Sequence, residues 1–210
     1  MPTDRSLGGV VLAGGYSTRF GEADKAVADL AGRPMITHVV DRLAAVADDI
    51  VVNCRDEQLA SIRDAFADAD ADVEPTYATD PVPDRGPLAG IRVGLEAADR
   101  EYAAVVACDM PFADPNLFET LYEHARGRDG AVVQLEDGWY QTTQAVYRTE
   151  TMARACGDVI DSDDRRILTA FEQLDVATVP EAELEDISER TFESIDTQEA
   201  LREAERRLEK

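Results

Sequence analysis

The sequence predicts an α/β fold in which helices cover both faces of a mostly parallel central sheet. Short apolar runs typical of buried strands recur along the chain, at residues 10–13, 49–53 and 102–108. Segments with apolar residues at helical spacing alternate with these runs, as at residues 35–43 and 88–98. The length of 210 residues suits one hydrophobic core, so we expect a single domain over residues 1–210.

The loop after the first strand is rich in groups that bind anions. Gly14 and Gly15 leave the backbone bare where the chain must turn, so a phosphate can approach the main chain closely. Ser17 and Thr18 add hydroxyl donors, and the cations that follow are Arg19 and Lys25. We therefore expect this loop to hold a chain of phosphates, with Leu12 and Ala13 at its start.

Two common phosphate-binding motifs are absent from this loop. A P-loop needs Lys and then Ser or Thr after its last glycine, whereas Gly21 is followed by Glu22. The dinucleotide fingerprint GxGxxG does not occur in the chain. The loop therefore matches neither of these two motifs.

The next elements bring further polar groups to the ends of predicted strands. Pro34 opens a helix, and the following apolar strand ends at Asn53. A helix from residue 58 and a short strand over residues 73–79 lead to Asp80. Because the carboxyl ends of parallel strands open toward the ligand crevice, Asn53 is well placed to contact a nucleotide.

A proline-rich loop over residues 80–87 precedes the helix that starts near Leu88. The helix begins with the sequence GPLAG at residues 86–90. Free backbone amides at a helix N-terminus favour electronegative ligand atoms, and the small residues allow a flat base to come close.

The strand over residues 102–108 is apolar throughout, which predicts a central position with both faces buried. Asp109 follows it directly. A carboxylate at the end of a central strand, beside an anion-binding loop, is a natural ligand for Mg²⁺. Pro111 stands where a two-aspartate DxD motif would need its second Asp.

Strands are expected over residues 131–135 and 144–147, flanking a hairpin signal at residues 137–138, and a helix is expected over residues 166–174. The chain ends in a helix over residues 198–208, which Thr197 can cap. Asp196 is either a second metal ligand or an ordinary acid at a helix start. Arg165 and Arg166 could bind a phosphate group of a substrate, or they could form ion pairs with Asp163 and Asp164.

The loop VVLAGGYSTRFGEADK resembles the signature of the nucleotidylyltransferases, LAGG-x-S-x-R-F/M-G followed by DK. Residues 86–90 with Asp80, and the CDMP sequence ending at Pro111, resemble two further signatures of molybdenum cofactor guanylyltransferases (MobA-like proteins). The cytidylyl branch tends to carry LAAG in the first loop. The resemblance implies a Rossmann-like three-layer sandwich of the nucleotide-diphospho-sugar transferase fold.

The implied reaction is transfer of GMP from GTP to the phosphate of molybdopterin, with release of pyrophosphate. The resemblance implies catalytic roles for Arg19, Lys25 and Asp109, with Asp109 on Mg²⁺. It also implies that GTP contacts the following residues: Leu12, Ala13, Gly14, Gly15, Lys25, Asn53, Asp80 and Asp109. Transient contacts with proteins that deliver or accept the cofactor are a further expectation.

Several alternatives share most of these residues. They are a molybdopterin cytidylyltransferase, a cobinamide-phosphate guanylyltransferase, a sugar-phosphate nucleotidylyltransferase and a non-catalytic nucleotide-binding protein. Gln141 is followed by Thr142, where many family members have Pro, which puts an acceptor-binding role of this segment in doubt.

The charge balance excludes some partners. With 21 basic and 44 acidic side chains the net charge is −23, so nucleic acid is not an expected partner. Lys25 and Lys210 are the only lysines, and such an acidic surface suits a cytoplasm of high salt. The three cysteines are far apart, which predicts reduced thiols and a cytoplasmic protein, and no apolar run is long enough to predict a membrane span.

Overall fold

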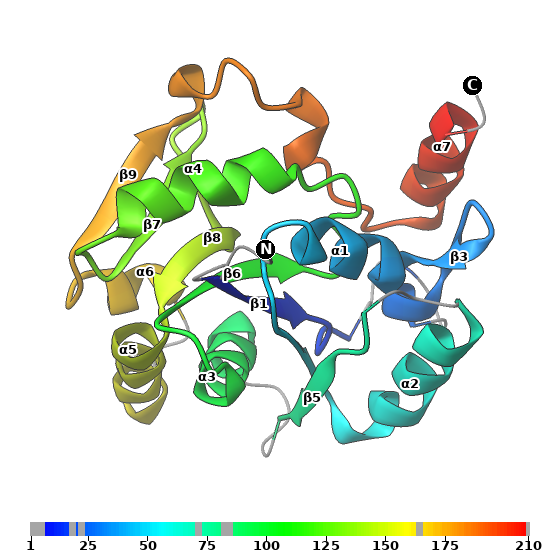
Figure 1. Ribbon diagram of the computed structural model, residues 1–210, viewed down its shortest axis with the longest axis horizontal. Helices are drawn as coiled ribbons and strands as arrows, with labels where there is room; N and C mark the ends of the chain where they lie inside the picture. The colour runs from blue at the N-terminus through cyan, green and yellow to red at the C-terminus, as the bar shows by residue number, and fades with distance from the viewer. Residues whose placement is uncertain are drawn as a thin grey trace, which may run out of the picture.

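Seven strands form the central sheet of the computed structural model, which describes residues 7–16, 20, 24–69, 73–80, 86–162 and 166–208. Their order across the sheet is β5-β4-β1-β6-β8-β7-β9 (Figure 1). The strands are β1 (Leu7–Leu12), β4 (Ile50–Cys54), β5 (Thr76–Thr79), β6 (Tyr102–Ala107), β7 (Gly130–Gln134), β8 (Tyr140–Arg148) and β9 (Val176–Pro180). Strand β8 is antiparallel to β6 and β7, and the other pairings are parallel.

Helices cover both faces of this sheet (Figure 1). Helices α1 (Met35–Ala44), α2 (Leu59–Asp68) and α4 (Pro115–Ala125) bury apolar side chains against one face. Helices α3 (Pro87–Ala97), α5 (Thr149–Asp161) and α6 (Ile167–Phe171) pack on the other. The predicted three-layer α/β fold with a mostly parallel sheet is therefore confirmed.

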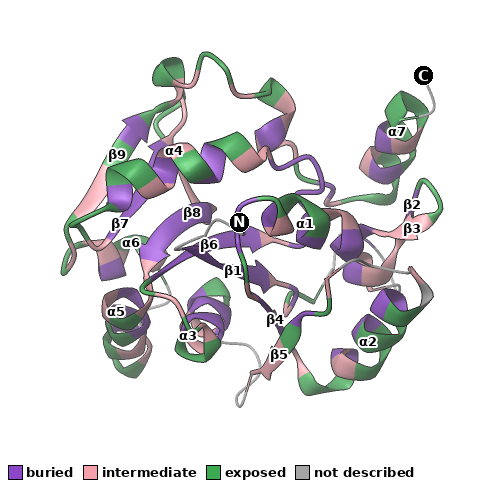
Figure 2. Ribbon diagram, in the orientation of Figure 1, coloured by how far each residue is buried: buried purple, intermediate pink, exposed green. Residues whose placement is uncertain are grey.

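The middle of the sheet is the most deeply buried part of the molecule (Figure 2). Strand β6 is fourth of the seven strands, and Val105 and Val106 on its two faces are fully buried. Its neighbour β1 pairs with β4 on one side and with β6 on the other. From β1 the chain first continues to β4 and β5 on one side and then crosses to β6 on the other side. At such a reversal of strand order a crevice opens at the carboxyl ends of the strands.

Smaller elements complete the fold. Strands β2 (Asp29–Leu30) and β3 (Arg33–Pro34) form a hairpin that contacts helix α7 (Gln198–Leu208). A small hydrophobic cluster containing Phe20, Phe112 and Leu201 joins α7 to this part of the chain. The 3-10 turns are η1 (Lys25–Val27), η2 (Asp56–Gln58), η3 (Glu181–Glu183) and η4 (Glu189–Phe192).

Several predicted boundaries were wrong. The strand expected over residues 73–79 begins only at Thr76. Strand β8 starts at Tyr140, not at Gln144, because Tyr140 pairs with Gln134 across an irregularity in β7. Its first residues are polar and half-buried, so no apolar run marks them. Helix α6 ends at Phe171, earlier than expected.

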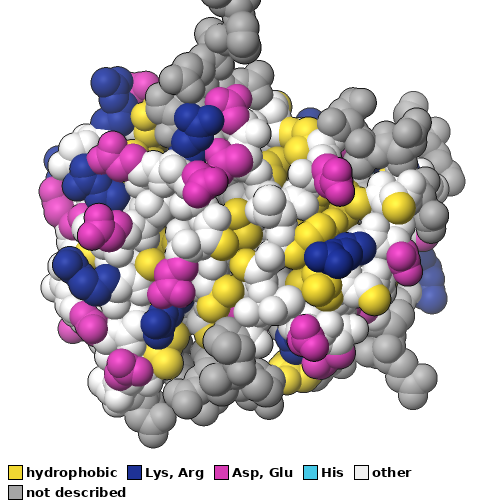
Figure 3. Space-filling model, turned by 60° about the horizontal axis from the view of Figure 1, so that its bottom comes forward, with side chains coloured by type: hydrophobic (Ala, Val, Ile, Leu, Met, Phe, Trp, Pro, Cys, Tyr) yellow, Lys and Arg dark blue, Asp and Glu magenta, His cyan; other side chains and the backbone are white. Residues whose placement is uncertain are grey.

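On the face drawn in Figure 3, acidic and basic side chains are interspersed, with hydrophobic patches between them. None of the described helices is both long and apolar enough to cross a membrane.

Candidate functional site

A pocket of about 430 Å³ lies at the carboxyl ends of the parallel strands. Its volume is within the usual range for small-molecule sites. The predicted residues that line it are Leu12, Gly14, Gly15, Lys25, Asn53, Asp80 and Asp109. Residues from four separate parts of the chain thus meet at one place, as expected from the parallel order of β5, β4, β1 and β6.

Lys25 lies between two carboxylates. Its Nζ is 2.5 Å from Oδ2 of Asp109 and 3.0 Å from Oδ1 of Asp196. The two aspartates come from the end of β6 and from the segment before α7, so the contact depends on the whole fold. Lys25 of the glycine-rich loop and Asp109 at the end of β6 are thus in direct contact.

The electrostatics of this cluster follow from its burial. Burial raises the pKa of Asp109 and the nearby Asp196 raises it further, and together they outweigh the opposite effect of Lys25. Burial acts to lower the pKa of Lys25, but Asp109 and Asp196 raise the pKa by more. The pKa of Lys25 is therefore above its ordinary value. The ammonium therefore remains charged at neutral pH and offsets repulsion between the two carboxylates.

Local structure holds Lys25 in place. Asp24 caps the short turn η1, and its Oδ1 accepts a hydrogen bond from the N–H of Ala26. The other oxygen of Asp24, Oδ2, accepts a hydrogen bond of 2.6 Å from Nε2 of Gln58. Lys25 thus begins a turn whose cap is itself anchored to the start of α2.

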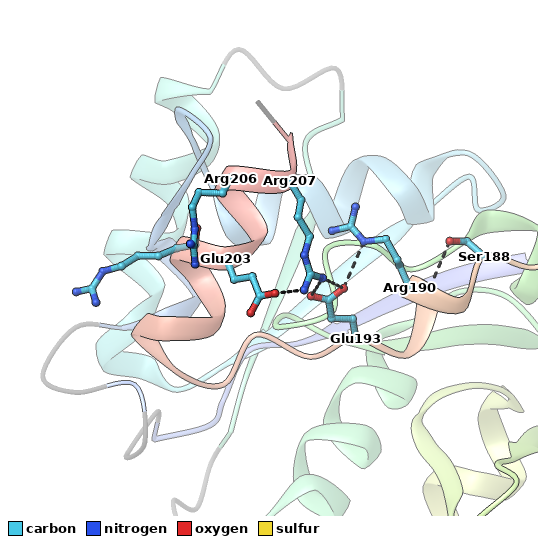
Figure 4. Close-up of polar contacts among 7 residues, drawn as sticks. Ser188, Arg190, Glu193, Glu203, Arg206 and Arg207 are labelled. Atoms are coloured by element: carbon cyan, nitrogen blue, oxygen red, sulfur yellow. Dashed lines mark hydrogen bonds and ion pairs between the residues drawn. The ribbon is translucent and has the colours of Figure 1, made fainter. Parts of the chain in front are cut away.

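Asp196 is delivered by a segment that returns to the site late in the chain. The N–H of Ile195 donates to the carbonyl of Asp109 at 2.8 Å. Glu193 pairs with Arg190 and with Arg207 of α7, as Figure 4 shows. These contacts attach the residues that precede Asp196 to the end of β6 and to α7. The expected cap is confirmed, since Thr197 Oγ1 accepts a hydrogen bond from the N–H of Ala200.

Asn53 and Asp80 place an amide and a carboxylate on the pocket wall. Asn53 is 1% exposed, and its Nδ2 donates to Oδ1 of Asp80 at 2.8 Å and to the carbonyl of Ala78. Burial raises the pKa of Asp80, and the hydrogen bond from Asn53 and the nearby charge of Arg55 oppose this shift. A carboxylate and an amide side by side supply the hydrogen-bonding groups that recognise a nucleobase edge.

Glycines make room for these two side chains. A Cβ on Gly90 would lie 2.5 Å from Oδ1 of Asn53, and one on Gly14 would lie 2.8 Å from Oδ2 of Asp80. Gly86 has φ +69°, in the left-handed region that favours glycine, and it precedes the first turn of α3. The start of α3 therefore approaches the pocket with a positive dipole end.

Not every predicted residue reaches the pocket. Ala13 is buried and does not line it, because its N–H donates to the carbonyl of Asn53 and its carbonyl accepts from Gln58. Gln141 and Thr142 do not line it either. Arg19 and Arg165 lie outside the described residues, and Arg166 is exposed away from the lining.

The structure adds residues that the sequence analysis did not single out. Arg55, Tyr16 and Thr143 also line the pocket. Arg55 follows β4 just after Asn53, so its position near a strand end was the available signal. Thr143 lies on β8, whose polar start carried no strand signal.

Asp109 and Asp196 are the described carboxylates that would hold a divalent metal at this end of the pocket. No cluster of three or more His, Cys, Asp or Glu side chains suited to a metal occurs among the described residues. Asp109 and Asp196 nevertheless place two carboxylates on one ammonium. One or two carboxylates that complete their coordination with substrate phosphates are a common way for a protein to bind a divalent metal.

Comparison with known proteins agrees with this geometry. Residues 9–179 match the family described as the MobA-like NTP transferase domain. A probable molybdenum cofactor guanylyltransferase of Natronomonas pharaonis is 47% identical over 201 residues, covering 95% of this chain and 97% of the relative. One from Methanosarcina acetivorans is 32% identical, covering 94% and 89% respectively.

A solved structure leads to the same family. The chain is similar to molybdopterin-guanine dinucleotide biosynthesis protein A from Archaeoglobus fulgidus, with a TM-score of 0.77 and 26% identity. The likeness covers 97% of this chain and 99% of that protein. With the matched domain spanning most of its length, this chain belongs to the MobA-like NTP transferase family.

Proposed function

We propose that this protein transfers GMP from GTP to the terminal phosphate of molybdopterin cofactor and releases pyrophosphate. The observation that carries the proposal is the contact of Lys25 with Asp109 inside a pocket that also holds the glycine loop and the Asn53–Asp80 pair. The named relatives support the choice of nucleotide and acceptor.

The reaction needs alignment and charge neutralisation more than proton transfer. An ionised phosphate oxygen of the acceptor attacks the α-phosphorus of GTP, a new P–O bond forms, and the bond to the pyrophosphate oxygen breaks. The nucleophile already carries a negative charge, so no general base is required. Catalysis then depends on positioning two anions in line and on stabilising the charge that develops.

We assign each of the phosphate-binding residues a separate role in this reaction. The amides of Gly14 and Gly15 donate no hydrogen bond to any described residue, which leaves them available to the triphosphate. Lys25 is assigned to the developing phosphoryl charge, and Arg19 to the triphosphate. Asp109, and Asp196 with it, would hold Mg²⁺, which when bound neutralises charge on phosphate oxygens.

At the other end, Asp80 and Asn53 are assigned to the guanine base. Guanine presents an N–H and an adjacent NH₂ group on one edge, and a carboxylate can accept from both. Leu12 and the start of α3 then flank the base and sugar. Cytosine and adenine lack this pair of donors, so Asp80 favours guanine.

The experiment is a transfer assay with purified protein. The protein is incubated with Mg²⁺, α-labelled GTP and molybdopterin cofactor, and both pyrophosphate and the labelled dinucleotide are measured. Parallel reactions contain CTP or ATP in place of GTP, or cobinamide phosphate in place of the acceptor. The proposal requires product with GTP and molybdopterin above all other pairs.

Each other outcome points to a different class. Product with CTP would identify a cytidylyltransferase, and product with cobinamide phosphate would identify a guanylyltransferase for another acceptor. Nucleotide binding without pyrophosphate from any acceptor would indicate a non-catalytic protein. Contacts with proteins that deliver or accept the cofactor, and a cytoplasmic location, stay predictions.

A further inference from the structure

One arginine contacts three consecutive residues of the glycine loop. Arg55 follows β4, and its Nη1 donates to the carbonyl of Gly14 at 2.9 Å and to that of Gly15 at 2.7 Å. Its guanidinium carbon lies 4.3 Å from the ring centroid of Tyr16, a cation–π contact. The side chain is only 14% exposed, and Glu57 pairs with its Nε at 2.9 Å. The guanidinium is therefore held from two sides.

This contact determines how the loop presents its amides. A trans peptide group is planar, so its N–H points opposite to its carbonyl. With the carbonyl of Gly14 turned to Arg55, the N–H of Gly15 is turned away from the guanidinium. Two successive glycines have the widest choice of backbone conformations, and the Arg55 contacts restrict that choice.

A second side chain from the same turn holds the two ends of the loop. Nε2 of Gln58 donates to the carbonyl of Ala13 at 3.0 Å and to Oδ2 of Asp24 at 2.6 Å. Its Oε1 accepts from the N–H of Arg55 at 3.1 Å. Gln58 is 3% exposed, and these hydrogen bonds use both ends of its amide. The end of β1 and the residue before Lys25 are thus joined through one buried amide.

We propose that Arg55 and Gln58 are positioning residues that preset the glycine loop and Lys25 for the phosphates of the nucleotide. The turn after β4 holds the loop in its binding conformation before the nucleotide arrives, so less conformational freedom is lost on binding. The base is assigned to Asn53 and Asp80, and Arg55 acts on Asp80 through its charge. The inference rests on the proposed function, because it assumes that the loop binds a triphosphate.

The test compares GTP with guanosine. Dissociation constants for both are measured by calorimetry with Arg55→Met, Arg55→Lys and Gln58→Met, at one salt concentration. Arg126→Met is the matched control, since Arg126 also pairs with a nearby glutamate but lies on the surface after α4. Thermal unfolding of each variant is recorded alongside.

Arg55→Met should weaken GTP by about tenfold or more, the usual cost of losing a charged hydrogen-bonding group, and leave guanosine within about twofold. Arg55→Lys should recover part of the loss, since an ammonium can still donate to both carbonyls. Gln58→Met should weaken GTP selectively as well. Arg126→Met should leave both ligands unchanged.

Three results would overturn the proposed clamp, that is, the positioning of the glycine loop and Lys25 by Arg55 and Gln58. They are equal weakening of GTP and guanosine, unchanged GTP affinity with only a lower unfolding temperature, and full GTP affinity in Gln58→Met and Arg55→Met alike. If the unmodified protein bound no GTP, the proposed function itself would fail. If it bound GTP and transferred GMP while the variants bound equally well, only the clamp would fail.

Discussion

The ammonium of Lys25 lies 2.5 Å from a carboxylate oxygen of Asp109, although the two residues are 84 positions apart in the chain. One follows the first strand and the other follows the central strand, and Asp196 completes the cluster from the segment before the last helix. Lys25 and Asp109 also line the pocket of about 430 Å³, so this cluster joins three distant parts of the chain at the candidate site.

Asp109→Asn should lower the rate of pyrophosphate release by roughly 10²–10³-fold, the usual cost of removing one group that stabilises transition-state charge. The substitution keeps the size of the side chain and removes its charge, so the fold should be retained. Release is measured with saturating GTP, and circular dichroism checks the fold. Full activity in this variant would refute the assignment of Asp109.

Asp196→Asn separates the two roles left open for this residue. If Asp196 is a metal ligand, the substitution should lower the affinity for Mg²⁺. Activity at low Mg²⁺ then falls, and excess Mg²⁺ restores part of the lost activity. As an ordinary acid before α7, its loss should change activity little at any concentration. A Mg²⁺ titration of activity, with Glu199→Gln on the exposed start of α7 as the control, decides between them.

Binding of GTP should weaken at acidic pH because of Asp80. Burial raises the pKa of this carboxyl, and protonation removes an acceptor for the guanine donors. Affinity is therefore full above the raised pKa and is lost as the pH falls through it, at a higher pH than for an exposed aspartate. The dissociation constant is measured between about pH 4 and about pH 7, around the ordinary carboxyl range.

Asp80→Asn provides the comparison for that titration. The variant should bind GTP more weakly at neutral pH, and its affinity should vary less across the same range. A pH dependence equal to that of the unmodified protein would show that another group titrates.

Gly90→Ala should weaken nucleotide binding by about tenfold through Asn53. The added Cβ would meet Oδ1 of Asn53 at 2.5 Å, so the amide must leave its hydrogen bond with Asp80. Gly157→Ala on α5 is the control, because its Cβ would lie 3.4 Å from the flexible end of Arg92. Equal affinities for both variants would show that Asn53 tolerates displacement.

Thermal stability should rise with KCl. A net charge of −23 leaves the folded chain under strong self-repulsion, which salt screens. The midpoint of unfolding should increase between about 0.1 M and about 3 M KCl as the screening length shortens. At mildly acidic pH, where carboxylates begin to protonate, the same titration should give a smaller increase. A midpoint that did not rise at neutral pH would remove the high-salt hypothesis.

Much of the fold could be predicted because it is encoded locally. Apolar runs mark β1, β4 and β6, and Pro34 and Pro87 mark the starts of α1 and α3. The polar residues after these strands were also recognisable, because parallel strands direct their carboxyl ends to one edge. Strand β8 was placed wrongly at its start because its half-buried residues are polar.

By itself, the sequence determined which segments are strands and helices and which loop can bind phosphate, since these depend on residues close together in the chain. Only the tertiary structure decided that Lys25 sits between Asp109 and Asp196, and that Arg55 and Gln58 grip the loop. The physical reason is that hydrogen bonds between distant residues depend on strand order and on side-chain direction across the sheet. Strand order and side-chain direction across the sheet produce no pattern in the nearby sequence from which they could be predicted.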